Sequence, residues 1–249
     1  MLRRILFGVA VLVCSSPALA QHMVAIDSSR AVSEIDVATG AKTPISTASV
    51  GAGTTGGLAL GAGNTVYLTS TSNDSLYTLD VPTGNATLVG AYGDAAIVMH
   101  GLEYVPATDT LYGLSSHDNG LYQIDKTTGA ASLVGTTGLT SFSNLGWNPN
   151  TGVMYLTNSG TDSLYTLNLA TGAVTLVGTL NGPTNPNGLA FDTADGQMYL
   201  VDNNTDSLYT LNLATGAATL VGSTGTGNLL GLVFLPGALP VELQGFTAE

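Results

Sequence analysis

Short apolar runs recur along this chain in a fixed order, separated by polar or glycine-containing turns. In the segment 188–230 the apolar tetrad 188–191 is followed by the runs 198–201, 208–213 and 218–221. Apolar and polar residues alternate there with a period of two, and Tyr, Thr, Val and Leu are frequent. This pattern favours short β-strands, and no apolar spacing of helical period extends over three turns. The segment therefore predicts four strands.

The same unit occurs repeatedly, with a period of 43 or 44 residues. Four antiparallel strands in a unit of this length are typical of one β-propeller blade. The tetrads begin at Gly57, Gly101, Asn144, Gly188 and Gly231. A Thr-Gly turn precedes the fourth strand in five places, and we expect its glycine to close a tight hairpin with a positive φ. These glycines are Gly40, Gly84, Gly129, Gly172 and Gly216.

The two ends of the repeat region are incomplete and complementary. Residues 23–47 hold only the last three strands of a unit, and residues 231–235 hold only a first strand. Pairing the two would close the ring and remove exposed sheet edges. We therefore predict an all-β, five-bladed β-propeller over residues 21–235, with four-stranded antiparallel blades and an N-terminal blade completed by the C-terminal strand. The remaining blades are expected at about 57–100, 101–143, 144–187 and 188–230.

A closed ring of this kind predicts a monomer. An open stack of blades, or a dimer that completes the ring, is the alternative. An open stack needs polar capping repeats at both ends, and neither end of the repeat region has one.

The first 20 residues have the features of an export signal. Two arginines precede the apolar run 5–13, and residues 18–20 read Ala-Leu-Ala, which is a typical cleavage site. We therefore expect a mature chain that begins at Gln21 and is exported to the periplasm, the cell surface or the medium. A lipoprotein anchored at Cys14 is the alternative, although bulky Val13 precedes that cysteine.

Charge and composition limit the partners. Without the signal, three cationic side chains remain against 17 acidic ones, which gives a net charge of −14. Phosphate-rich partners need clustered Lys and Arg, so we expect neither nucleic acid nor anionic lipid as a partner. The apolar run of the signal is too short to span a bilayer and no later stretch qualifies, so no membrane span is predicted. The mature chain has no cysteine, so its stability must come from its core.

The sequence of residues 154–168 resembles the YVTN-type β-propeller repeat of exported bacterial and archaeal proteins. It reads Met-Tyr-Leu-Thr-Asn-Ser-Gly-Thr-Asp-Ser-Leu-Tyr-Thr-Leu-Asn. The likeness extends over residues 23–235. Leu-Tyr-Thr-Leu replaces the usual Val-Ser-Val-Ile core of that repeat. This chain has five units, whereas propellers with that repeat commonly have seven. The resemblance implies a secreted or surface-exposed propeller, often without known activity, and carries over no catalytic residue. The tail 236–249 resembles the Pro-Val-Glu-Leu segment of exported bacterial proteins and predicts a linker or short appendage.

Propeller ligands usually meet the face on which the connections between blades and the second-to-third-strand turns converge. We therefore take as ligand-binding candidates the polar residues of these loops that differ between copies. They are Asn158, Asn181, Asn185, Asn187, Asp202, Asn204 and Asn228.

Glu103 and His100 are the candidates for catalysis. Glu103 occupies a tetrad position that is small or apolar in every other copy, on the innermost strand, where a carboxylate needs a partner or a shifted pKa. It is an acid, a base or a metal ligand in the channel, or else a polar plug bonded to backbone or water. His100 is either a channel ligand or a structural residue. Three residues of strand span about 10 Å, so the two side chains need not share a site.

A weak calcium motif lies at residues 202–206, where Asp202, Asn204 and Asp206 place oxygen atoms at alternate positions. The alternative is that these aspartates cap turn amides, since an aspartate recurs at the position of Asp206. Zinc clusters, a Gly-x-Ser-x-Gly elbow and a phosphate-binding loop are absent from the sequence. Apart from calcium, the sequence predicts no cofactor.

Three hypotheses of function remain. The first is a non-enzymatic exported propeller that binds or scaffolds a glycan, an envelope component or another protein through its polar loop face. The second is a propeller-type hydrolase or lactonase that uses Glu103 with a loop carboxylate or Ca²⁺. The third is a surface structural protein without a small ligand. Acidic residues converging on one channel mouth would favour the second.

Overall fold

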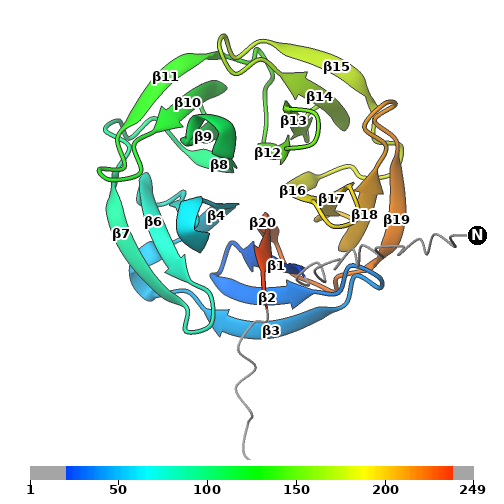
Figure 1. Ribbon diagram of the computed structural model, residues 1–249, viewed down its shortest axis with the longest axis horizontal. Helices are drawn as coiled ribbons and strands as arrows, with labels where there is room; N and C mark the ends of the chain where they lie inside the picture. Colours follow the sequence, from blue (N-terminus) through cyan, green and yellow to red (C-terminus); the bar gives the residue numbers. More distant parts are fainter. Residues whose placement is uncertain (1–20, 238–249) are drawn as a thin grey trace, which may run out of the picture.

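The computed structural model describes residues 21–237, which form five four-stranded antiparallel sheets around one axis (Figure 1). This confirms the predicted five-bladed β-propeller. Blade 1 contains β20 (Leu229–Pro236), β1 (Gln21–Asp27), β2 (Ala31–Ile35) and β3 (Lys42–Thr47). Blade 2 contains β4 (Thr55–Leu60), β5 (Val66–Ser70), β6 (Ser75–Asp80) and β7 (Asn85–Ala91).

The other three blades have the same order of strands. Blade 3 contains β8 (Met99–Val105), β9 (Thr110–Ser115), β10 (Gly120–Ile124) and β11 (Ala131–Thr136). Blade 4 contains β12 (Ser143–Asn148), β13 (Val153–Asn158), β14 (Ser163–Leu167) and β15 (Val174–Thr179). Blade 5 contains β16 (Pro186–Asp192), β17 (Gln197–Asp202), β18 (Ser207–Leu211) and β19 (Ala218–Ser223). Three short 3₁₀ turns complete the fold: η1 (Val50–Ala52), η2 (Ala62–Asn64) and η3 (Pro106–Thr108).

Strand β20 closes the ring by pairing with β1. The two strands are antiparallel and in register, with Val233 opposite Val24 and Leu232 opposite Ala25. The predicted closure is therefore confirmed, and the innermost and outermost strands of blade 1 come from opposite ends of the described chain. The predicted export signal, 1–20, and the part of the predicted tail from residue 238 on lie outside the described residues.

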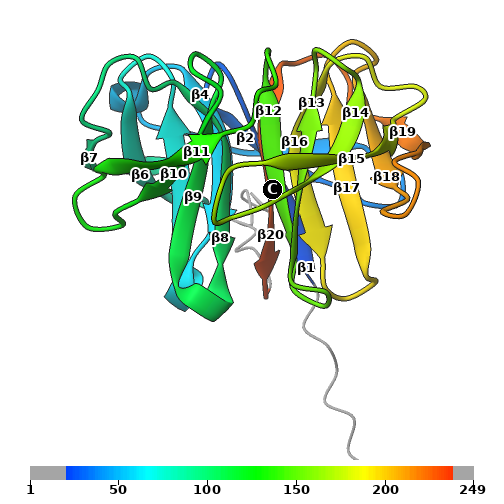
Figure 2. The same ribbon diagram turned by 90° about the horizontal axis from the view of Figure 1, so that it is seen from above.

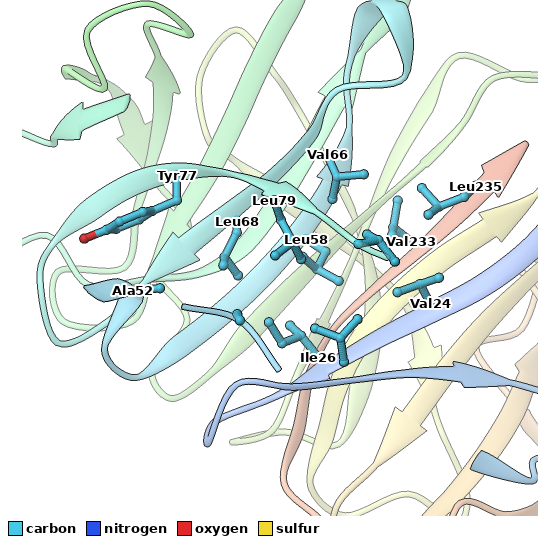
Figure 3. Packing of buried hydrophobic residues seen from close by; sticks show 13 residues of the cluster. Val24, Ile26, Ala52, Leu58, Val66, Leu68, Tyr77, Leu79, Val233 and Leu235 are labelled. Atoms are coloured by element: carbon cyan, nitrogen blue, oxygen red, sulfur yellow. The ribbon is translucent and has the colours of Figure 1, made fainter. Parts of the chain in front are cut away.

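The apolar core is divided into five clusters, one between each pair of neighbouring blades. Figure 3 shows the cluster between blades 1 and 2, in which Val24 and Val233 face Leu58 and Leu68. Each blade is thus buried on both faces, which explains why the second strand of blade 2, β5, is buried along its whole length. Alternating sequences suit this architecture because successive side chains of a strand point to the two neighbouring blades.

The recurring Thr-Gly turns also connect the blades. All five glycines have φ between +74° and +81°, as predicted for a tight hairpin. Each turn also packs against the outermost strand of the preceding blade: a Cβ added to Gly129 would lie 2.2 Å from the carbonyl oxygen of Gly90. Two features therefore require glycine at this position: the positive φ, and the close approach of the preceding blade's outermost strand, which leaves no space for a Cβ atom.

The five innermost strands, β4, β8, β12, β16 and β20, line the central channel (Figure 1). They begin on the face formed by the connections between blades, and end on the face where β1 starts (Figure 2). Among residues 21–237 no helix is long and apolar enough to cross a membrane.

Candidate functional site

The innermost strands approach one another too closely for most side chains at the first tetrad position. A Cβ added to Gly57 would lie 2.9 Å from the backbone nitrogen of Leu102, and one added to Gly231 would lie 2.7 Å from that of Leu58. Glycine at this position therefore lets the five strands meet around a narrow channel.

Asn144 is the exception at this position, and its side chain crosses the channel. With its amide oriented by the hydrogen-bond network, the Asn144 nitrogen donates to the carbonyl oxygens of His100 and Leu230, both at 3.2 Å. These two acceptors belong to blades 3 and 1, and blade 1 is not a neighbour of blade 4. Asn144 is 3% exposed. It therefore ties three innermost strands together, and a separate cavity lies at each end of the channel.

The first cavity, called the His100 cavity, has a volume of about 170 Å³ and lies on the face of the inter-blade connections. All five blades contribute to it. None of its lining side chains carries a charge at neutral pH, and most offer an amide or hydroxyl group. The lining residues are Ser28, Thr54, Thr71, His100, Phe142, Asn185, Asn187, Asn228 and Leu230.

His100 is held in place by two neighbours. Its Nδ1 lies 3.0 Å from the Oγ of Ser116, and its ring meets the ring of Phe142 edge-on with centroids 4.5 Å apart. Burial lowers the pKa of His100 to about 4, and nearby His117 acts in the same direction. The imidazole is therefore neutral at physiological pH and offers both a donor and an acceptor.

Three of the predicted ligand-binding residues, Asn185, Asn187 and Asn228, line the His100 cavity together with His100. Internal bonds orient them. The Asn187 amide nitrogen donates to the Asn185 carbonyl at 3.0 Å, and that of Asn203 donates to the Asn228 side-chain oxygen at 2.7 Å.

The other four candidates lie outside this lining. Asn158 is fully buried, and its amide nitrogen donates to the Thr140 carbonyl at 2.7 Å and to the Ser143 hydroxyl at 2.9 Å. Asn204 donates to the Thr184 hydroxyl at 3.0 Å. Asn181 is exposed and accepts a bond from the hydroxyl of Thr179.

Asp202 is 1% exposed, and its carboxylate is occupied by turn donors. One oxygen accepts the backbone N–H groups of Asn204 and Thr205, and the other accepts the N–H of Asn185 at 2.6 Å. This is the bonding of a turn cap, the alternative to calcium. Among residues 21–237 no three His, Cys, Asp or Glu side chains gather into a metal-binding group. The calcium hypothesis for Asp202, Asn204 and Asp206 stays a prediction.

The second cavity, called the Glu103 cavity, has a volume of about 150 Å³ and lies where the innermost strands end. Its walls are mostly apolar and aromatic, and again all five blades contribute. The lining residues are Gln21, Leu58, Ala59, Leu60, Glu103, Tyr104, Pro106, Trp147, Pro149, Ala190, Phe191, Thr193, Leu232, Val233 and Phe234.

Glu103 caps two backbone donors of the innermost strands. One carboxylate oxygen accepts the N–H of Tyr104 at 2.9 Å, and the other accepts the N–H of Trp147, on the next blade, at 3.1 Å. Burial raises the pKa of Glu103 to about 7, although these two bonds act in the opposite direction. Within residues 21–237 no other carboxylate lines this cavity, so the acidic residues of this range do not converge on its mouth.

Larger hollows on the outside of the ring belong to the repeat itself. Three of them, of about 390, 500 and 430 Å³, lie at equivalent positions of blades 2, 4 and 1, along the ends of their second and third strands. Equivalent positions of the second, third and fourth strands supply most of each lining, although individual residues differ, such as His22 and Glu34 in blade 1 and Trp147 in blade 4, and we assign no particular site to them. The two axial cavities, in contrast, are each lined by residues of all five blades.

Sequence reasoning missed Asn144, Phe142 and Trp147. Asn144 carries a signal in the sequence, because its tetrad is the one that does not begin with glycine. Trp147 is the single tryptophan of the chain, but its tetrad position is apolar in every copy and gives no hint of a cavity. Phe142 lies in a connection of irregular sequence, where nothing indicates the contact with His100.

Comparisons with known proteins agree on the fold. No family model matches the chain, and no curated protein matches its sequence. Similar solved structures, all β-propellers, include a nidogen/laminin complex, with a TM-score of 0.61 and 14% identity over 88% of this chain and 100% of that one. A protein of unknown function from Bacteroides thetaiotaomicron has a TM-score of 0.58 and 15% identity over 86% of this chain and 60% of that one.

A further similar structure is a catalytically inactive histidine-to-alanine variant of virginiamycin B lyase from Staphylococcus aureus with quinupristin. Its TM-score is 0.52, with 14% identity over 80% of this chain and 65% of that one. Identities this low carry over neither ligand nor activity. The chain is a β-propeller whose fold is shared with proteins of different functions.

Proposed function

We propose that this protein is an exported, monomeric, non-enzymatic binding module that recognises a glycan in the His100 cavity. The observation that carries the proposal is the lining of that cavity: amides, hydroxyls, a neutral imidazole and one aromatic ring, without a charged side chain, in a chain with 17 acidic residues. Export is supported by the signal-like N-terminal sequence and by the YVTN resemblance.

Glycan recognition suits this chemistry because a sugar carries many hydroxyl groups, each a donor and an acceptor. Amide and hydroxyl side chains offer the matching donors and acceptors. Phe142 lines the cavity, is 45% exposed as a residue, and offers an apolar surface for the C–H face of a sugar ring. At about 170 Å³ the cavity is smaller than the usual range of about 300–1,000 Å³ for drug-sized ligands, so we propose that it takes a terminal sugar of a glycan on an envelope component or partner protein.

The hydrolase alternative is not favoured. Ser116 and His100 lie within hydrogen-bond distance, as a nucleophile and its base would. A general base works best with a pKa near the operating pH, however, and burial lowers that of His100 to about 4. Glu103 lies in the other cavity, on the opposite face from Asp202 and Asp206.

The test is a glycan array probed with the purified, labelled protein, followed by calorimetry on the strongest hit. We expect saturable binding, weakened about tenfold or more by His100→Ala and about threefold by Phe142→Ala. Asn181→Gly, an exposed change in a connection that leads to the cavity, is the matched control and is expected to bind normally. Thermal melting verifies that each variant is folded. The absence of any saturable hit, or hits that neither cavity variant weakens, would contradict the proposal.

A further inference from the structure

The Glu103 carboxyl group has acceptor capacity that residues 21–237 do not use. Each oxygen accepts one backbone N–H, from Tyr104 and from Trp147. An ionised carboxylate has about four acceptor sites. Two of them therefore have no hydrogen-bond partner within the described part of the chain, and the residue lines an open cavity.

Space around this carboxyl group comes from the other four blades. At the same tetrad position they carry Ala59, Gly146, Ala190 and Val233, whose side chains are all shorter than that of glutamate. Beyond them, Trp147, Phe191 and Phe234 line the cavity. The site thus combines one carboxyl group with a lining that is mostly apolar and aromatic, in which Gln21 and Thr193 are further polar residues.

In the part of the chain that the structure describes, no cation pairs with the Glu103 carboxylate. Lys126, on the β10–β11 turn, is paired with Asp109 and lies 5.0 Å from the centre of the Tyr104 ring. The Tyr104 hydroxyl donates to the same Asp109 at 2.6 Å. On the β16–β17 side, Asp192 adds a carboxylate rather than a cation, and the net charge of −12 attracts cations to the whole molecule.

We propose that the Glu103 cavity binds a primary ammonium group that carries a short aromatic or aliphatic substituent. The ammonium donates to the free acceptor sites of Glu103, and the substituent packs against Trp147, Phe191 and Phe234. This site is independent of the proposed glycan site, because the two cavities lie at opposite ends of the channel on either side of Asn144. The two proposed ligands also differ, because the ligand of the Glu103 cavity is a cation with an apolar substituent, whereas the ligand of the His100 cavity is a sugar.

Trp147 makes the proposal measurable, because the single tryptophan of the chain lines this cavity and its backbone N–H donates to Glu103. Trp147 also lines the outer hollow of blade 4, so the Glu103 variant described below assigns the signal to this cavity. Benzylamine is titrated into the full chain at pH 8 while tryptophan fluorescence is recorded, with calorimetry as a second measurement. We expect a saturable change. Benzyl alcohol, the neutral counterpart, is expected to bind at least about tenfold more weakly, since its single hydroxyl carries no positive charge and forms no ion pair with the carboxylate.

Two variants locate the site. Glu103→Gln keeps the size of the side chain and should weaken benzylamine binding at least about tenfold. Glu34→Gln removes the same charge from β2, outside the cavity, and is expected to bind normally. Binding to the native protein should also strengthen from pH 6 to pH 8, because burial raises the pKa of Glu103 to about 7 and the ammonium pairs with its ionised form.

Three outcomes would overturn the proposal. Equal affinity for benzyl alcohol would show that the cavity takes apolar groups without regard to charge. Equal weakening by Glu103→Gln and Glu34→Gln would reduce the effect to net charge. No binding by fluorescence or calorimetry in the native protein would remove the site altogether. None of these results bears on glycan binding at the other mouth.

Discussion

The two ends of the channel are built by the same five strands, yet they differ in chemistry. At the His100 cavity the strands begin, and connections between blades together with turns between second and third strands supply most of the lining, so amides and hydroxyls gather there. At the Glu103 cavity the strands end, and the lining comes largely from tetrad residues that also pack the blades together. In this repeat protein, different polar residues therefore line the end of the channel where the loop sequences differ between blades. At the other end, the tetrads carry apolar or small residues in four blades and an acidic residue, Glu103, in one.

Each mouth nevertheless contains one titratable side chain whose neutral form is favoured by burial. The pKa of His100 falls to about 4, while that of Glu103 rises to about 7. Burial disfavours the charged form in both cases, but the charged form is the protonated one for histidine and the deprotonated one for glutamate. The two groups should therefore influence stability in opposite directions over a shared pH range.

The largest predicted effect is this pair of opposed pH dependences. For Glu103, unfolding restores a pKa near 4.5, so between pH 4.5 and 7 the native state binds more protons and stability falls as pH rises. For His100, unfolding restores a pKa near 6.5, so between pH 4 and 6.5 the unfolded state binds more protons and stability rises. The pKa differences between the unfolded and native states, from 6.5 to about 4 for His100 and from 4.5 to about 7 for Glu103, make each contribution about 3 kcal/mol.

Single variants should separate the two contributions. Denaturant unfolding is measured from pH 4 to 8, and each variant is compared with the native protein so that other carboxylates cancel. The measured quantity is the free energy of unfolding of each variant minus that of the native protein. For Glu103→Gln this difference should increase as the pH rises from 4.5 to 7. For His100→Gln it should decrease as the pH rises from 4 to 6.5. Curves parallel to the native one for both variants would mean that neither pKa is shifted by folding.

The second prediction concerns the residue between the cavities. Asn144→Ala leaves the carbonyl oxygens of His100 and Leu230 without their donor in a buried position, which costs about 1–3 kcal/mol. For a domain of this size each kcal/mol lowers the melting temperature by about 2–4 °C. Asn144→Gly should cost a similar amount, even though glycine is the residue of the other four copies. A melting temperature unchanged in both variants would show that water satisfies these carbonyls and that Asn144 merely fills space.

Repetition explains how much of the fold the sequence predicts. Comparing copies establishes the number of blades, the four strands of each and the closure by β20, because each feature is indicated several times. The same comparison singles out Glu103, whose equivalents are small. The separation of His100 and Glu103 follows from strand geometry instead: three residues of strand span about 10 Å, so the two side chains need not share a site, and they line different cavities.

The parts that sequence could not predict depend on side-chain direction. Asn158 and Asn187 look alike in the sequence, as polar residues in loops of one face. In the structure Asn158 bonds inward to Thr140 and Ser143, while Asn187 lines the His100 cavity. A short amide chain satisfies its own turn or faces a ligand according to backbone geometry that alternation and spacing do not encode.

The smallest predicted effect tests whether a loop residue outside both cavities is merely a turn residue. Asn181 is exposed and has a φ of +57°, a conformation that asparagine and glycine tolerate and alanine does not. Asn181→Gly should therefore change stability by less than about 0.5 kcal/mol, whereas Asn181→Ala should cost about 1 kcal/mol. Both should bind the array hit as the native protein does, because the side chain lies outside the His100 cavity. Weaker binding by the glycine variant, at unchanged stability, would show that the binding surface extends from the His100 cavity along the β15–β16 connection. Asn181 would then be a binding residue and not only a turn residue.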